Sequence, residues 1–298
     1  MKIMILGGNG FIGSRLVYFL SSKCEVCSMD KYPPSVEIEN VHYIVGDYFD
    51  TDFLRNVLSD VDVVIYSIGL LNPTNSKDNY RVGYEKEMSQ LLTLCQMMLE
   101  RKQKLIFISS GGTVYGNQEK DILDEDSPTF PINHYGGVKL CMENVIRIFA
   151  LQMGMRACIA RISNPYGEGQ DYHKGVGFID AVIRKALLGE EIEVWGDGEI
   201  KRDYIYIDDV CNMLYALCNY EGSQIIFNIS TGVGTTQNQV LAIVSQQIGT
   251  ISVKYVPARS IDVKSNILCN ERICSICDIQ PIELHEGIKK YINYLANK

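Results

Sequence analysis

The sequence predicts an α/β protein built on a doubly wound parallel sheet, and three observations favour that class. Short apolar runs alternate with amphipathic stretches over the first two thirds of the chain. The first apolar run leads directly into glycines, as a strand-to-helix turn does. The composition is that of an ordinary globular protein, because 46% of the 298 residues are hydrophobic and 21% are charged.

The apolar runs predict strands, and the amphipathic stretches between them predict helices. The expected strands are Lys2–Leu6, Glu25–Met29 with Asp30 at its end, Val41–Val45, Val61–Tyr66, Leu105–Ile108 and Ala157–Ile162. The expected helices are Phe11–Leu20, Tyr84–Arg101 and Tyr135–Met153. In the second of these helices, apolar residues recur close to the 3.6-residue period of an α-helix.

After about Asn164 the alternation loosens, because glycines and polar residues interrupt short elements. Helices are expected at Phe178–Leu188, Val210–Asn219 and Leu284–Leu295, and a strand at Ile225–Ile229. We therefore expect residues 1–164 to form the sheet domain. Residues 165–298 are expected to form mainly a smaller, mixed region, some of whose elements return to the first domain.

The turn after the first strand has the glycine spacing of a phosphate-binding loop. Residues 7–13 read Gly-Gly-Asn-Gly-Phe-Ile-Gly. Glycines there permit a tight turn, close backbone approach to a pyrophosphate, and close packing of helix on strand. The free N–H groups at the helix start attract an anion. This pattern predicts a Rossmann fold that binds a dinucleotide.

Asp30 stands about 20 residues further on, at the end of the second strand, where a ribose-binding carboxylate is expected. A carboxylate accepts hydrogen bonds from ribose hydroxyls and repels the extra phosphate of NADP, so NAD is the expected cofactor. The neighbouring Lys31 keeps NADP as an alternative. A solvated acid at a strand end is the structural alternative for Asp30.

Tyr135 and Lys139 lie four residues apart on an expected helix, which places both side chains on one face. A nearby ammonium and an oxidised nicotinamide both favour the phenolate and so lower the pKa of a tyrosine. Such a tyrosine can take a proton from a sugar hydroxyl while hydride leaves to the cofactor. An isolated Tyr-x-x-x-Lys is more often a surface pair, but here it follows a dinucleotide loop.

With these motifs, the chain resembles an extended short-chain dehydrogenase/reductase, close to the UDP-glucose 4-epimerase-like enzymes of the NAD-dependent epimerase/dehydratase family. The resemblance covers nearly the whole chain. It rests on the stretches 7–13, 46–47, 109–116, 135–139, 161–167, 202–210 and 257–263, of which 109–116 reads Ser-Ser-Gly-Gly-Thr-Val-Tyr-Gly. It implies an α/β Rossmann domain followed by a smaller, mixed C-terminal substrate-binding region.

The resemblance also implies roles for individual residues. Those expected to bind NAD are Gly7, Asn9, Gly10, Phe11, Ile12, Gly13, Asp30, Asp47, Tyr48, Ser67, Tyr135 and Lys139. Those expected to bind the substrate are Ser110, Asn164, Arg202, Arg259 and Asp262. The two arginines suit phosphate oxygens because a guanidinium donates in a fork. For each of the polar residues, a surface salt bridge is the alternative.

Three departures from the family pattern bear on the reaction. Gly111 stands where the epimerases place a Ser or Thr that relays between the catalytic tyrosine and the sugar O4, so Thr113, or else Ser110, is expected to substitute. Gly112 and Thr113 stand where the 4,6-dehydratases place an Asp-Glu pair, which disfavours that elimination. Leu70 and Leu71 occupy the stretch where epimerases often carry a cofactor-binding lysine.

The resemblance implies a sugar-nucleotide 4-epimerase acting through a 4-keto intermediate, on UDP-glucose and UDP-galactose or their N-acetyl forms, with Tyr135, Lys139 and Thr113 as catalytic residues. A 4-keto-sugar-nucleotide reductase that consumes NAD(P)H is the alternative. A non-catalytic dinucleotide-binding protein is a third hypothesis, disfavoured because the Tyr135/Lys139 pair is present.

Composition restricts the partners and location. A net charge of −8 lacks the basic excess of a nucleic-acid-binding protein. The apolar N-terminal run is too short for a signal or spanning segment, so we expect a cytoplasmic protein without membrane contact. The ten cysteines are expected to be reduced, and the pairs Cys24/Cys27 and Cys274/Cys277 to bind no metal. A homodimer through the helices Tyr84–Arg101 and Tyr135–Met153 is expected from the family.

Overall fold

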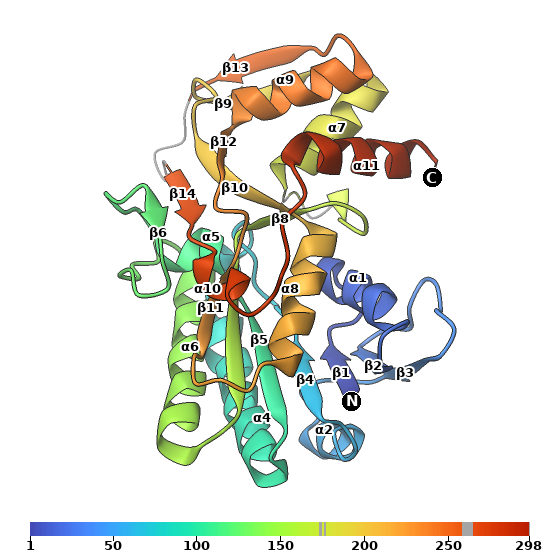
Figure 1. Ribbon diagram of the computed structural model, residues 1–298, viewed down its shortest axis with the longest axis vertical. Coiled ribbons are helices and arrows are strands. Elements are labelled where there is room, and N and C mark those ends of the chain that lie inside the picture. Colours follow the sequence, from blue (N-terminus) through green and yellow to red (C-terminus); the bar gives the residue numbers. More distant parts are fainter. Residues whose placement is uncertain (173–174, 176, 258–264, 298) are drawn as a thin grey trace.

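Seven parallel strands form the main sheet of the computed structural model, in the order β11-β7-β5-β4-β1-β2-β3 (Figure 1). The structure describes residues 1–172, 175, 177–257 and 265–297. The strands of the sheet are β1 (Lys2–Leu6), β2 (Glu25–Asp30), β3 (Val41–Val45), β4 (Val63–Tyr66), β5 (Lys104–Ser110), β7 (Ala157–Ile162) and β11 (Ile226–Ile229). The order reverses at β1, as in a doubly wound sheet, so the predicted fold class is confirmed.

Side chains of β1 show why both faces of this sheet are covered. Ile3 and Ile5 belong to one apolar core with α1 (Phe11–Leu20) and α8 (Ile207–Asn219). Met4 and Leu6 belong to a second core with α4 (Met88–Arg101) and α6 (His134–Met153). Alternate residues of a strand point to opposite faces, and a parallel sheet is stable when helices bury both.

The second region lies beyond the carboxyl ends of these strands (Figure 1). Its larger sheet has the order β12-β10-β14-β6, with β8 paired to β10 outside that path. These strands are β6 (Ile122–Leu123), β8 (Asn164–Tyr166), β10 (Lys201–Tyr206), β12 (Gly234–Thr236) and β14 (Ser265–Leu268). A two-stranded sheet joins β9 (Ile192–Trp195) and β13 (Val253–Val256). The helices α7 (Phe178–Leu188), α9 (Gln237–Ile248) and α11 (Leu284–Ala296) enclose a third apolar core with these strands.

Two segments connect the two regions in space. β6 comes from the first part of the sequence and pairs with β14 of the second region. β11 comes from the later part and pairs with β7 of the main sheet. The boundary at residue 164 stays a prediction.

The expected helix Tyr84–Arg101 differs most from the structure. A helix α3 (Ser76–Val82) precedes it, the turn Gly83–Glu87 is a π-helix labelled η1, and only α4 is regular α-helix. Gly83 lets this turn pack closely on its neighbours, because a Cβ there would lie 2.5 Å from Leu71 Cδ1 and 2.8 Å from Val138 Cγ2. The short helices α2 (Thr51–Val57), α5 (Gly111–Val114) and α10 (Glu271–Cys274) complete the described elements.

None of the helices in the described part of the chain has the length and apolar character needed to cross a membrane. All ten cysteines are free thiols.

Candidate active site

The turn between β1 and α1 has the backbone geometry that its glycines predict. Gly7 has a φ of +87°, and the amides of Gly7 and Gly8 donate to Met29 O at 2.9 and 3.1 Å. A Cβ at Gly13 would lie 2.1 Å from Gly7 O. The start of α1 therefore packs directly on the turn, and no side chain caps its first N–H groups. An anion can approach these donors.

Asp30 is held at the edge of this turn. Its Oδ2 accepts from the Asn9 amide at 3.0 Å, and its Oδ1 accepts from the Lys31 amide at 2.7 Å. The Asn9 side chain donates to Tyr32 O at 2.6 Å, which ties the glycine turn to the chain that follows β2. The carboxylate thus faces the glycine turn rather than bulk solvent alone.

A cleft of about 400 Å³ opens between the glycine turn and the ends of β2, β3 and β4. Seven of the residues expected to bind NAD line it: Gly7, Asn9, Gly10, Asp30, Asp47, Tyr48 and Ser67. Gly46, Lys31 and the segment from Ile68 to Leu70 complete much of its wall. Phe11, Ile12 and Gly13 lie at the start of α1 beside the turn and do not line the cleft.

Tyr135 and Lys139 lie on the first turns of α6, whose N-cap Asn133 accepts from the Gly136 amide at 2.8 Å. The Tyr135 hydroxyl is hydrogen-bonded to the Ser110 side chain at the end of β5. Lys139 Nζ donates to Ile108 O at 3.0 Å and lies 4.8 Å from the centre of the Phe107 ring. The pair therefore stands directly on the carboxyl end of β5.

Burial sets the resting charge of this pair. Burial raises the pKa of Tyr135, the hydrogen bond with Ser110 lowers it, and the charge of Glu87 raises it. Burial lowers the pKa of Lys139, while Glu87 and Glu143 raise it. Without ligand, the phenol is therefore protonated at neutral pH, and the lowering expected beside an oxidised nicotinamide stays a prediction.

The loop from Ser110 to Thr113 carries the two hydroxyls considered for the relay. Thr113 Oγ1 lies 3.4 Å from Ser110 O, within its own turn of α5, whereas the Ser110 hydroxyl meets Tyr135. A Cβ at Gly111 would lie 2.4 Å from Leu268 Cδ1 and 3.0 Å from Arg161 O. A Ser or Thr at position 111 would therefore require the Leu268 side chain to move. The catalytic role of Thr113 stays a prediction.

The residues expected to bind substrate are only partly placed. The Asn164 side chain donates to Asp203 O at 3.0 Å, and a Cβ at Gly112 would lie 3.7 Å from Asn164 Oδ1 and 4.0 Å from the Ser110 hydroxyl. Arg202 lies on β10, two residues before Tyr204, which pairs with Asn164 of β8. Arg259 and Asp262 lie outside the described residues.

Comparison with known proteins decides the family. The model of the NAD dependent epimerase/dehydratase family matches residues 3–230. The chain belongs to this family.

Similar proteins from three organisms cover between 80% and 99% of this chain. A Methanocaldococcus jannaschii protein, provisionally named a UDP-glucose 4-epimerase, is 31% identical over 99% of this chain and 98% of its own. A dTDP-4-dehydro-6-deoxyglucose reductase of Escherichia coli is 30% identical over 80% of this chain and 79% of its own. The crystal structure of the Thermus thermophilus UDP-glucose 4-epimerase in complex with NAD is 25% identical, covers 99% of each chain and has a TM-score of 0.88.

The cofactor of the family enzyme is NAD, and its residues suit that molecule. A larger residue at Gly7 or Gly13 would fill the glycine turn. A Cβ at Gly7 would lie 3.0 Å from Ser67 O, and one at Gly13 would meet the Gly7 carbonyl. Asp30 presents a carboxylate at one wall of the cleft. These features match a pyrophosphate and a ribose.

Several polar residues that support the candidate active site of this protein were not predicted from the sequence. Glu143 and Arg161 form a buried ion pair at 2.7 Å, one turn of α6 beyond Lys139, and Ser109 donates to Glu143. No local motif marks this pair, since the partners lie on different elements. The Arg161 guanidinium also lies 4.9 Å from the centre of the Tyr115 ring.

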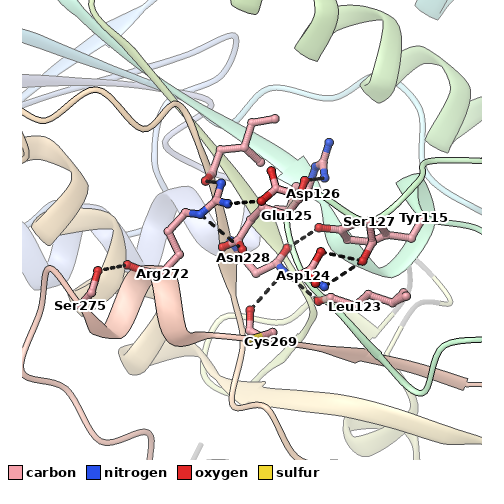
Figure 2. Close-up of polar contacts among 12 residues, drawn as sticks. Tyr115, Leu123, Asp124, Glu125, Asp126, Ser127, Asn228, Cys269, Arg272 and Ser275 are labelled. Atoms are coloured by element: carbon pink, nitrogen blue, oxygen red, sulfur yellow. Dashed lines mark hydrogen bonds and ion pairs between the residues drawn. The ribbon is translucent and has the colours of Figure 1, made fainter.

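Figure 2 shows a further polar junction around Asn228 of β11. Asn228 accepts from the Tyr115 hydroxyl at 2.7 Å and donates to Leu123 O and Cys269 O, each at 3.1 Å. The backbone amide of Asn228 donates to Glu125 Oε1 at 2.8 Å. The junction therefore joins the main sheet, the loop after β6 and the end of β14 just behind the active-site loop.

Proposed function

We propose that this family enzyme is a sugar-nucleotide 4-epimerase that interconverts UDP-glucose and UDP-galactose or their N-acetyl forms. The observation that carries the proposal is the contact of the Tyr135 hydroxyl with Ser110, beside the buried Lys139 ammonium. The names of the relatives, which include UDP-glucose 4-epimerases, support the substrate class.

In the proposed reaction, Tyr135 takes the proton of the sugar 4-hydroxyl, and Ser110 conducts that proton between the sugar oxygen and the phenol. NAD, when bound, supplies the hydride acceptor and later the hydride donor at C4. Lys139 holds a positive charge near the phenol while Ile108 O fixes its position. Protonation by Tyr135 of the 4-keto oxygen completes the second half of the cycle.

Tyr135 is expected to act as a base only when the oxidised cofactor is bound. Burial keeps its pKa high in the ligand-free protein, so the phenol holds its proton. An oxidised nicotinamide brings a positive charge, which favours the phenolate and lowers the pKa toward the working pH. Base strength is therefore coupled to the oxidation state of the cofactor.

The substrate must stay anchored while its sugar presents the opposite face. Asn164, Arg202, Arg259 and Asp262 are the proposed anchors for the diphosphate and the nucleoside. Anchoring keeps the 4-keto sugar at high effective concentration between the two hydride transfers. Thr113 is retained as a candidate for a further contact to the sugar.

The decisive experiment incubates the purified protein with UDP-glucose, UDP-galactose and their N-acetyl forms without added cofactor. Products are separated by chromatography while the absorbance of reduced nicotinamide is followed. Interconversion of a C4 pair without net absorbance change is expected. Retention of a single configuration at C4 in every product would rule the proposal out.

A 4-keto-sugar-nucleotide reductase is the second candidate, because one relative is named a dTDP-4-dehydro-6-deoxyglucose reductase. It predicts stoichiometric loss of NADH or NADPH absorbance with a 4-keto sugar nucleotide. The two reactions use the same tyrosine and lysine, so net cofactor turnover separates them.

A further inference from the structure

A buried carboxylate outside the predicted site lies on a turn that packs against α6, the helix that carries Tyr135 and Lys139. Glu87 ends the π-helical turn η1, and only 3% of its surface is exposed. The turn packs on α6, where a Cβ at Gly83 would meet the side chain of Val138, the neighbour of Lys139. π-Helical turns are rare and occur frequently at functional sites.

One oxygen of Glu87 has a defined structural task. Glu87 Oε1 accepts from the Leu70 amide at 2.5 Å. Leu70 belongs to the segment after β4 that lines the cofactor cleft with Ser67 and Gly69. By accepting from Leu70, the Glu87 carboxylate therefore holds in place the segment that forms one wall of the cofactor cleft.

The charge of Glu87 has a second task. Burial raises the pKa of Glu87, whereas the Leu70 amide and the Lys139 ammonium lower it. The positive charge of Lys139 therefore favours the ionised form of Glu87. Glu143, the other carboxylate acting on Lys139, is already paired with Arg161.

We propose that Glu87 is a positioning residue: its carboxylate holds the Leu70 segment at the wall of the cleft and supplies the counter-charge of the Lys139 ammonium. The inference rests on the proposed role of Tyr135 and Lys139. It adds a residue that acts on the reaction through these two groups and touches neither substrate nor cofactor itself.

Other titratable groups share the same surroundings and must be considered in any titration. They are Tyr48, Tyr66, Cys95, Tyr135, Lys139 and Glu143. Burial raises the pKa of Tyr48 and Tyr66, and raises that of Cys95 to about 12. These three groups therefore stay neutral through the range in which Tyr135 and Lys139 are followed.

Glu87→Gln separates the two tasks, because the amide oxygen still accepts from Leu70 but the charge is gone. Loss of a negative charge lowers the pKa of both Tyr135 and Lys139. The ionisation of Tyr135 is read without substrate or cofactor, as the phenolate absorbance difference between matched proteins with Tyr135 and with Tyr135→Phe. We expect Glu87→Gln to lower the pKa of Tyr135 by about one unit.

Glu85→Gln is the matched control. Glu85 lies on the same turn, is exposed and pairs with Arg81 at 3.1 Å, so its removal changes the net charge equally at the surface. An unchanged Tyr135 titration in Glu87→Gln, or an equal shift in Glu85→Gln, would overturn the proposal.

Glu87→Leu tests the structural task by removing the acceptor as well. NAD binding, measured by calorimetry, should weaken about tenfold in Glu87→Leu and stay near the parent value in Glu87→Gln. Equal affinity in all three proteins would overturn the anchoring role, and Glu87→Gln still tests the charge if Glu87→Leu does not fold.

Activity then distinguishes the two proposals. In an active epimerase, Glu87→Gln should move the whole pH profile of kcat to lower pH with little change in KM. If no sugar nucleotide is converted but the Tyr135 titration shifts as expected, the proposed function fails and the role of Glu87 stands.

Discussion

The space available at single positions around Tyr135 determines which hydroxyl can assist its phenol. A side chain at position 111 would displace Leu268 and lie 3.0 Å from the Arg161 carbonyl, which disfavours a hydroxyl there. Ser110, one residue earlier, reaches the Tyr135 hydroxyl. The relay proposed for this enzyme is therefore one residue earlier in the sequence than the family pattern implies.

Ser110→Ala should lower kcat about a hundredfold, the usual loss when a proton-transfer partner is removed. The hydrogen bond with Ser110 lowers the pKa of Tyr135, so its loss raises that pKa and moves the acidic limb of the kcat profile to higher pH. The measurement is the pH dependence of epimerisation. Thr113→Val is compared in the same assay, and a larger loss there would assign the relay to Thr113 instead.

Single residues were predictable where one local segment carries the chemistry. The glycines of the turn, Asp30 and the Tyr135/Lys139 pair each follow from spacing along the chain. Glu87 and Leu268 were not predictable, because their effect depends on segments that meet only after folding. The rise of the Tyr135 pKa caused by burial was also not predicted, because burial depends on neighbours that meet only after folding.

Among the secondary-structure elements, the number of residues in a helix or strand determines whether a sequence pattern can predict it. Helices such as α6 and α7 contain enough residues to show a period, and their structural bounds lie within one residue of the predicted ones. Strands such as β8, β12 and β14 have three or four residues, so their existence depends on pairing with β10. α9 was missed although Thr236 and Gln239 form a capping box at its start.

That capping box gives a prediction about stability. Thr236 Oγ1 accepts from the Gln239 amide at 3.1 Å, and the Gln239 side chain accepts from the Thr236 amide at 2.8 Å. Thr236→Ala should lower the free energy of unfolding by about 1 kcal/mol, because an N–H at the helix start loses its partner. Urea denaturation measures this loss. Thr250→Ala, in the exposed loop after α9, should cost less than half as much, and equal costs would contradict the capping role.

For the whole molecule, the two regions share structural elements. α8 contributes Val210, Leu214 and Leu217 to the core that contains Ile3 and Ile5 of β1. A fragment of residues 1–164 lacks α8 and the edge strand β11, so one face of its sheet keeps α1 but loses the cover that α8 provides. We expect this fragment to show no cooperative thermal transition by circular dichroism, whereas the full chain does. A sharp transition in the fragment would show instead that residues 1–164 fold independently.

The homodimer expected from the family gives a prediction about assembly. Exposed apolar side chains lie on the two helices concerned, with Leu92 on α4 and Ile148 and Leu151 on α6. Leu151→Arg should convert a dimer to a monomer, because it places a charge in the apolar contact. Sedimentation measures the mass. Leu188→Arg, an equally exposed position on α7, is the control that should stay dimeric, and a monomeric parent protein would refute the expectation.

The contact between Gly111 and Leu268 restricts the order in which this active site can change. Leu268 is fully buried on β14, so its side chain must repack among buried neighbours when a side chain appears at position 111. Gly111→Ser alone must displace Leu268, whereas after Leu268→Ala the Arg161 carbonyl, 3.0 Å from the new Cβ, still limits the space. The two positions are therefore expected to be epistatic, and a hydroxyl at position 111 should be tolerated best once the side chain at position 268 of β14 is smaller.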